Sequence, residues 1–202
     1  MKIVFDKVRL SFGNAILFDG LTAEFQSGRS TAIVGANGSG KSTLLKLAGQ
    51  FIEPDGGTVK ALDGDKELLR AEYRRRSAAV APTMNLYDRL TAEENLKFFA
   101  QLRGSTADLK IFDRVGLTIG DAKKLAGEYS TGMKQRLKFA ILLAANADVW
   151  LLDEPGANLD DEGRSMVLNE ISKAVGEGKL ILLATNDPVE AAVADEQLQL
   201  NV

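Results

Sequence analysis

Hydrophobic residues along the chain form short runs bordered by turn-forming residues, and such runs predict β-strands. The predicted strands span residues 3–12, 21–25, 31–34, 58–62, 78–81, 149–152 and 180–184. We expect the dipeptides Gly13-Asn14, Asp19-Gly20 and Ser27-Gly28 to form turns near the first of them. The last two runs are apolar throughout, which is typical of strands that are buried on both faces.

Between these strands, hydrophobic residues recur at the spacing of amphipathic α-helices. The predicted helices span residues 42–50, 91–115 with an interruption near Gly104, 132–145 and 162–175. The second begins with Thr91-Ala92-Glu93-Glu94, a capping box in which Thr91 and Glu94 each accept from the other's backbone N–H. Apolar strands that alternate with helices predict an α/β fold with a largely parallel sheet.

The composition restricts the chemistry of the protein. The chain has 202 residues and is 45% hydrophobic, which is enough for one globular domain with a substantial core. It contains neither Cys nor His, and this excludes cysteine nucleophiles, Ser-His-Asp triads and Cys/His zinc sites. Carboxylates, Lys, Arg, hydroxyls and backbone amides remain, and these groups are suited to phosphate chemistry.

Charge and hydropathy restrict the partners. The net charge is −3, which argues against a broad basic face, so no nucleic acid is expected as a partner. The first residues lack the apolar core of a signal peptide, and no apolar stretch is long enough to cross a bilayer. We therefore expect a cytosolic protein.

A glycine-rich loop lies between a predicted strand and a predicted helix. Its sequence, Gly35-Ala36-Asn37-Gly38-Ser39-Gly40-Lys41-Ser42, fits the phosphate-binding pattern G-x-x-x-x-G-K-[ST], and Thr43 follows it. In this pattern, backbone N–H groups and the helix N-terminus surround phosphate oxygens. We expect Lys41 to contact the β- and γ-phosphates and Ser42 to ligate Mg²⁺.

Two carboxylates follow the apolar run at residues 149–152. Asp153 ends this predicted strand and is expected at the ligand-binding edge of the sheet, where the Mg²⁺ of a phosphate-binding loop is held. Glu154 comes next and is a candidate general base for an attacking water. The alternative is an acidic pair that caps a following helix.

These motifs, in this order, resemble those of the ATP-binding subunits of ABC transporters. Residues 35–42 match the Walker A motif of that family. Residues 149–153 and Glu154 match its Walker B motif and the glutamate that follows it. Residues 155–160 are similar to its D-loop, with Asp160 as the aspartate.

A further segment, residues 129–136, resembles a variant of the family's Leu-Ser-Gly-Gly-Gln signature, with Ser130 and Gly132 at two of its positions. In the family, this segment contacts the γ-phosphate that is bound to a second subunit. The resemblance therefore implies a head-to-tail dimer with two ATP molecules between its subunits. The plain alternative is that Ser130 is the N-cap of a helix.

The resemblance also implies the architecture. It is an α/β fold of the P-loop NTPase, ABC type, with a mostly parallel core sheet, an N-terminal antiparallel β subdomain and a helical subdomain. Residues 1–202 would then form a single ATP-binding domain. Its core would comprise residues 1–90 and 146–202, and its helical subdomain about residues 91–145.

Two positions depart from the family pattern. Pro82 stands at the position of the Q-loop glutamine and has no side-chain oxygen for Mg²⁺ or water, so Thr83 or the shape of the loop would have to serve instead. Asn186 stands at the position of the H-loop histidine, where its amide can donate a hydrogen bond but does not titrate near neutral pH. It is either a catalytic residue or an adaptable loop residue ahead of a helix that Asp187, Pro188 and Glu190 begin and cap.

Three other features each have two interpretations. Phe12 matches the family aromatic that stacks on adenine, a contact worth about 1–3 kcal/mol, or it is an ordinary core residue. The run Arg74-Arg75-Arg76 is a solvated face of a helix or hairpin, or a contact for lipid headgroups or nucleic acid. The segments Leu86-Tyr87-Asp88 and Phe98-Phe99 are a docking groove for the membrane subunit if exposed, and core if buried.

The sequence thus predicts an ATP-binding and ATP-hydrolysing subunit of an ABC transporter, peripheral on the cytoplasmic face of the membrane. The expected cofactors are ATP and Mg²⁺. The expected partners are a second ATP-binding subunit and a separately encoded membrane-spanning subunit. The alternative is a catalytically weak or non-transport ABC ATPase that acts as an ATP-dependent binding switch.

Overall fold

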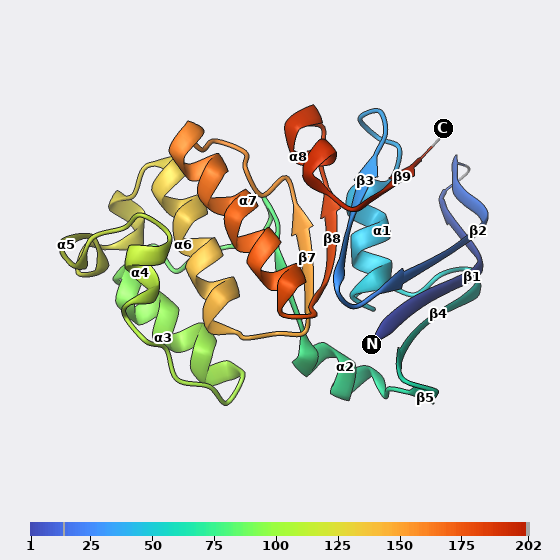
Figure 1. Cartoon of the computed structure of the whole chain (residues 1–202), viewed down its shortest axis with the longest axis horizontal. Coiled ribbons are helices and arrows are strands. Elements are labelled where there is room, and N and C mark those ends of the chain that lie inside the picture. The colour runs from blue at the N-terminus through green and yellow to red at the C-terminus, as the bar shows by residue number, and fades with distance from the viewer. Residues whose placement is uncertain (14, 201–202) are drawn as a thin grey trace.

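Two β-sheets organise the chain in the computed structural model, which describes residues 1–13 and 15–200 (Figure 1). One sheet is antiparallel and has the strand order β2-β1-β4-β5. Its strands are β1 (Lys2–Phe12), β2 (Ala15–Gln26), β4 (Gly56–Asp63) and β5 (Lys66–Glu67). It forms the right-hand part of Figure 1.

The other sheet is parallel and has the order β6-β7-β8-β3-β9. Its strands are β3 (Arg29–Val34), β6 (Ser77–Val80), β7 (Val149–Asp153), β8 (Leu180–Ala184) and β9 (Glu196–Gln199). The predicted α/β fold, with a parallel core sheet and an N-terminal antiparallel sheet, is therefore confirmed.

Helices cover the parallel sheet, and a further group of helices lies on one side of it (Figure 1). Between β6 and β7 lie α3 (Ala92–Leu102), α4 (Ile111–Arg114), α5 (Ile119–Ala122), a 3-10 turn (Ala126–Glu128) and α6 (Thr131–Ala144). The remaining helices are α1 (Lys41–Ala48), α2 (Arg70–Arg76), α7 (Asp161–Gly176) and α8 (Pro188–Val193). In the ranges that the structure describes, none of these helices is long and apolar enough to span a bilayer.

The side chains of β7 alternate between two hydrophobic layers. Val149 and Leu151 lie in the layer that contains the apolar residues of α1 and of the antiparallel sheet. Trp150 and Leu152 lie in the opposite layer, together with apolar residues of α6 and α7. Because both faces are covered, the strand is apolar from residue 149 to residue 152, and its first charged side chain is Asp153 at the carboxyl end. This packing places Asp153 at the edge of the sheet.

The capping box at the start of α3 is confirmed. Thr91 Oγ1 accepts from the Glu94 N–H at 3.1 Å, and the Glu94 carboxylate accepts from the Thr91 N–H at 2.7 Å. These bonds satisfy two backbone donors that have no partner inside the helix. They fix the start of α3 at the residue that the sequence predicts.

One predicted turn is wrong. The pair Asp19-Gly20 lies inside β2, where Arg9 is paired with Asp19 and Val8 with Leu21. Gly20 is therefore an extra residue opposite β1, which is a β-bulge, and β2 continues through it. The turn at Ser27-Gly28 is confirmed, and Asn14 of the predicted Gly13-Asn14 turn lies outside the described residues.

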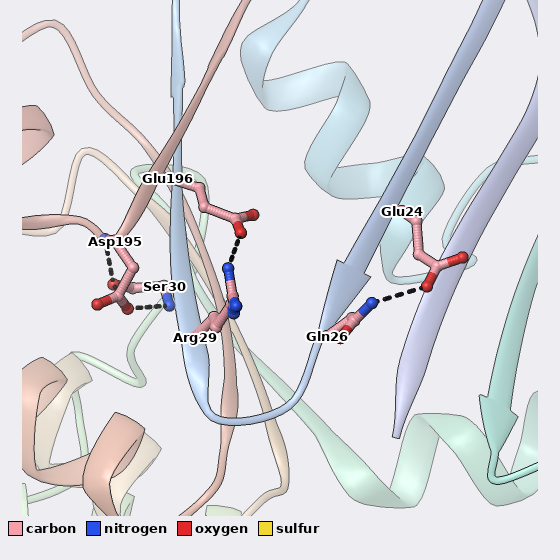
Figure 2. A network of polar contacts seen from close by, with 6 residues as sticks. All are labelled: Glu24, Gln26, Arg29, Ser30, Asp195 and Glu196. Atoms are coloured by element: carbon pink, nitrogen blue, oxygen red, sulfur yellow. Dashed lines mark hydrogen bonds and ion pairs between the residues drawn. The ribbon is translucent and has the colours of Figure 1, made fainter.

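Strand β9 is absent from the sequence-based prediction because Leu198 is its one apolar residue. Side-chain contacts join its beginning to β3 (Figure 2). The Asp195 carboxylate accepts from the N–H and the hydroxyl of Ser30, at 2.8 Å each, and Arg29 forms an ion pair with Glu196. The position of this edge strand thus depends on polar contacts that the hydrophobic pattern does not reveal.

The run Arg74-Arg75-Arg76 belongs to α2, as one of its two interpretations predicts. Arg74 and Arg75 are exposed, and the Arg74 guanidinium lies 5.1 Å from the centre of the Phe51 ring. Arg76 instead forms ion pairs of 2.6 Å with Asp63 and Asp148. Arg76 therefore fastens α2 to the fold, and the other two arginines form a solvated helix face.

Candidate functional site

The glycine-rich loop connects the carboxyl end of β3 with the N-terminus of α1. Gly40, the N-cap residue of α1, has a φ of 95°. A Cβ atom there would also lie 2.9 Å from the Phe18 ring, so the position requires glycine. Among the described residues, no side chain caps α1. Its first backbone N–H groups are therefore available to an anion such as phosphate.

Lys41 lies over this loop. Its ammonium donates hydrogen bonds to the carbonyl oxygens of Gly35, at 2.8 Å, and of Ala36, at 3.1 Å. The neighbouring Ser39 hydroxyl is buried and has no hydrogen-bond partner in the described part of the chain.

Ser42 and Asp153 meet between α1 and β7. The Ser42 hydroxyl donates to Asp153 Oδ1 at 3.0 Å. These hard oxygen atoms suit Mg²⁺, which takes few protein ligands beside phosphate and water oxygens. Within residues 1–13 and 15–200, no group of three His, Cys, Asp or Glu side chains could hold a metal ion. The residues present thus fit Mg²⁺ that is bound together with a phosphate group.

Glu154 follows Asp153 and contacts Asn186 through two hydrogen bonds. Its Oε1 accepts from the backbone N–H of Asn186 at 3.1 Å and from the Asn186 side-chain amide at 2.9 Å. The same amide nitrogen donates to Asn37 Oδ1 in the glycine-rich loop, also at 2.9 Å. Partial burial raises the pKa of Glu154, and the hydrogen bond from the Asn186 backbone opposes that rise. Asn186 therefore links the candidate base to the loop.

A cavity of about 380 Å³ brings most of the predicted site residues together. Its lining consists of Phe12, Leu17, Pro82, Asp153, Glu154, Asn186 and residues 37–38 and 40–43 of the loop and α1. Phe12 is 59% exposed, so the interpretation of Phe12 as a core residue is wrong. Its placement beside the glycine-rich loop leaves adenine stacking as the other prediction.

The loop after β6 is attached to α6. Lys138 of α6 donates to the carbonyl oxygens of Ala81, at 3.1 Å, and of Pro82, at 3.2 Å. Burial lowers the pKa of this ammonium. Pro82 lines the smaller cavity described above and also a second, larger one, whereas Thr83 lines only the larger one.

Ser130, Gly132 and Asp160 lie outside that smaller cavity. Ser130 is the N-cap of α6, and its hydroxyl accepts from the Met133 N–H at 3.2 Å. Asp160 is the N-cap of α7 and accepts from the Gly163 N–H at 2.9 Å. It also pairs with Arg136 of α6 at 2.7 Å, and these contacts lower the pKa of Asp160. Asp160 thus joins the start of α7 to α6.

The structure corrects the predicted role of Glu190. The helix begins as predicted, with Asp187 as N-cap and Pro188 at its first position, but Glu190 does not cap it. The Glu190 side chain, which is buried, instead accepts from the Gly156 N–H at 3.0 Å and from the Thr185 hydroxyl at 2.5 Å. Burial raises the pKa of this carboxyl. The capping prediction fails because two donors from neighbouring strand ends lie within reach of the side chain.

The larger cavity, of about 680 Å³, lies beside the phosphate loop and opens between α1, β6, α3 and α6. Phe51, Met84 and Phe99 contribute apolar surface, and Lys46 and Arg103 contribute charge. Next to it, Tyr87, Phe98 and Phe99 form an aromatic cluster with ring centres 5.0 to 6.0 Å apart. Tyr87 is exposed, both phenylalanines are half-buried, and Phe99 packs against the hydrophobic core. The cluster thus lies at the edge of the core, with Tyr87 as its exposed member.

Two kinds of sequence comparison identify relatives. The sequence model of the family described as ABC transporter matches residues 18–157. Nod factor export ATP-binding protein I of Paraburkholderia xenovorans is 35% identical over 198 residues, which cover 94% of this chain and 64% of that protein. The cytochrome c biogenesis ATP-binding export protein CcmA of Rhizobium etli is 34% identical over 191 residues, which cover 91% of this chain and 87% of that protein. The chain thus spans less than two thirds of the first relative's length.

Solved structures have the same fold. A structure described as the ATP binding subunit of an ABC transporter has a TM-score of 0.89 at 23% identity, with 100% of this chain and 86% of that chain covered. A dimeric structure of a bacterial ABC transporter cassette has a TM-score of 0.86 at 25% identity, with 98% and 94% covered. The predicted ABC-type fold is therefore confirmed.

Proposed function

Because this chain belongs to the ABC transporter family of ATP-binding proteins, we propose that it binds MgATP and hydrolyses it to drive a separate membrane-spanning subunit. One observation carries the proposal. A single cavity joins an uncapped helix N-terminus, the Ser42–Asp153 pair and the Glu154–Asn186 pair. It offers phosphate binding, a metal position and a general base side by side.

The phosphate groups would be held by the loop. Backbone N–H groups at the start of α1 donate to phosphate oxygens, and Lys41 leaves the carbonyls of Gly35 and Ala36 to contact the β- and γ-phosphates. Ser42 and Asp153 hold Mg²⁺ through their oxygen atoms. When bound, Mg²⁺ neutralises charge that develops on the phosphate oxygens.

Glu154 would orient the attacking water and take its proton. Burial raises its pKa, which makes the carboxylate a stronger base than an ordinary surface glutamate. The two hydrogen bonds from Asn186 fix the direction of the carboxylate. Asn186 therefore acts as a positioning residue in this proposal, with the amide in place of an imidazole.

Hydrolysis would require two copies of the chain. Ser130, Gly132 and Asp160 do not line the cavity that Lys41, Asp153 and Glu154 line. We propose that they complete the site of a second copy in a head-to-tail dimer. The N-terminus of α6, which has Ser130 as its N-cap and no acidic residue in its first turn, would face the γ-phosphate of that copy. The dimeric cassette among the similar structures supports the formation of a dimer.

The membrane-spanning subunit would bind at the larger cavity and the aromatic cluster of Tyr87, Phe98 and Phe99. Half-exposed aromatic side chains beside an apolar cavity suit a protein partner. The names of the two relatives describe export, so we propose an exporter and a position on the cytoplasmic face of the membrane. We also propose that residues 91–145 form a helical subdomain on a core of residues 1–90 and 146–202.

Phosphate release tests the enzymatic part of the proposal. We expect purified chain with ATP and Mg²⁺ to release phosphate, and Glu154→Gln to reduce the steady-state rate by at least about 100-fold. Glu154→Gln should still bind ATP, because the phosphate loop is intact. Equal, near-zero rates in both proteins would favour the alternative, an ATP-dependent binding switch. The departures at Pro82 and Asn186 are the observations on which that alternative rests.

A further inference from the structure

We infer that Glu190 is a positioning residue for hydrolysis: its buried carboxylate holds the backbone after Glu154 and, at the same time, the side chain of the residue before Asn186. The inference rests on the proposed function, because it assigns Glu190 a role through these two residues. Glu190 lies outside all the motifs by which the family was recognised, and it does not line the nucleotide cavity.

The two oxygen atoms of Glu190 hold two different chain segments. Oε1 accepts from the N–H of Gly156, two residues after Glu154, at 3.0 Å. Oε2 accepts from the hydroxyl of Thr185, the residue before Asn186, at 2.5 Å. The side chain comes from α8, at the top of the parallel sheet in Figure 1, and Glu190 is only 4% exposed. Water therefore does not compete for these bonds.

The backbone of Glu154 needs such support. Its φ is 49°, a left-handed conformation that is costly for a residue with a side chain. Such a conformation persists only where the surroundings fix it. The Glu154 N–H donates to the Ala184 carbonyl at 2.8 Å, and Glu190 holds Gly156 on the other side of the strained residue. The direction in which Glu154 points thus depends on both contacts.

The close approach of Glu190 explains the glycine at position 156. A Cβ atom built on Gly156 would lie 2.1 Å from Glu190 Oε1, which is far shorter than any allowed contact. The chain turn is held from the opposite side as well, since the Gln135 amide of α6 donates to the Pro155 carbonyl at 2.8 Å. The turn after Glu154 therefore lies between two buried polar side chains, one from α6 and one from α8.

Hydrolysis and amide exchange together test this inference. We expect Glu190→Ala to lower kcat by about 10- to 100-fold, because a small misplacement of a catalytic group has that effect, with ATP affinity within about twofold of the unaltered chain. Hydrogen exchange of the Gly156 amide should become at least about tenfold faster. Glu190→Gln keeps the shape of the side chain and one acceptor oxygen. Its kcat should therefore lie between that of Glu190→Ala and that of the unaltered chain. Glu177→Gln, an exposed carboxylate at the end of α7, is the matched control and should change neither readout.

A double variant separates positioning from general damage. If Glu190 acts through Asn186 and Glu154, then Asn186→Ala combined with Glu190→Ala should reduce kcat little more than the stronger single change does. Independent, multiplying losses would overturn the inference. So would a normal Gly156 exchange rate in Glu190→Ala, or a normal kcat despite faster exchange. Failure of the unaltered chain to hydrolyse ATP would instead overturn the proposed function, and the exchange experiment reports on the Glu190 contact even then.

Discussion

The two ends of the nucleotide cavity differ in how the chain builds them. At one end, the loop end, residues 35–42 form one continuous segment that Asp153 completes. At the other, the network end, Glu154 and Asn186 line the cavity and are joined by hydrogen bonds, and Glu190 of α8, outside the cavity, contacts the residues next to them. The loop end uses backbone groups that every sequence provides, so few of its side chains are critical. The network end depends on three particular side chains that bond to backbone and side-chain groups of other segments, so a replacement of any of them removes specific contacts.

The largest effect is expected at the loop end. Lys41→Ala removes the cation that would contact the β- and γ-phosphates, and charge-assisted hydrogen bonds of this kind are worth about 1.5–3 kcal/mol each. We expect ATP affinity to fall by about 100-fold, measured by titration with a fluorescent ATP analogue. Lys46→Ala on the same helix is the control, since Lys46 is exposed and does not line the smaller cavity. Equal losses in both variants would contradict a specific role of Lys41.

At the network end, Gly156→Ala places a methyl group against Glu190 Oε1. We expect the free energy of unfolding to fall by about 1–3 kcal/mol, as in other overpacked sites, and kcat to fall with it. Gly176→Ala is the matched control, because a Cβ atom there meets open space at the end of α7. That variant should be unchanged or up to about 1 kcal/mol more stable in chemical denaturation. Normal stability of Gly156→Ala would mean that Glu190 moves aside freely.

Asn186→Ala removes the side-chain amide and keeps the backbone N–H that contacts Glu154. We expect kcat to fall by about tenfold, the equivalent of one lost hydrogen bond, with KM for ATP little changed. Steady-state phosphate release at varied ATP measures both constants. Asn186→His restores a donor and tests whether an imidazole is better than the amide. A rate above that of the unaltered chain would show that the amide limits turnover.

The smallest effect concerns pH. Burial raises the pKa of Glu154 above its ordinary value of 4.5. A general base must be ionised, so activity is lost as the pH falls through this raised pKa, and the acid limb lies at higher pH than for an ordinary glutamate. The Asn186 side chain stabilises the ionised form, so Asn186→Ala should move the limb further toward neutral pH. A profile of kcat/KM against pH measures the position of the acid limb in both proteins. An unchanged acid limb in Asn186→Ala would mean that the Asn186 side chain does not affect the ionisation of Glu154.

The sequence predicts the loop end and most of the fold because their signals are local. The apolar runs at residues 149–152 and 180–184 give two central strands, and the pattern of residues 35–42 gives the phosphate loop. The capping box at Thr91 is equally local, since both of its bonds join residues three apart. Each of these features needs only one short segment to be recognised.

The network end can be predicted only in part from the sequence, because its contacts join residues that are far apart along the chain. Glu190 contacts Gly156, which is 34 residues away along the chain, so no short pattern contains both. The segment Asp187 to Glu190 also fits a helix cap, and this local signal points to the wrong partner. Strand β9 is not predictable from the sequence for the same reason, because Asp195 and Ser30 are 165 residues apart. Long-range polar contacts become visible only when the fold is known.

The attachment of Lys138 to the loop after β6 has a consequence for how this protein can vary. Its ammonium contacts the carbonyl oxygens of Ala81 and Pro82, and every residue type carries such an oxygen. Substitutions at positions 81 and 82 therefore leave the two acceptors in place, and the loop stays joined to α6. Residues that line the cavities at positions 81 and 82 can thus change while Lys138 keeps its two acceptors.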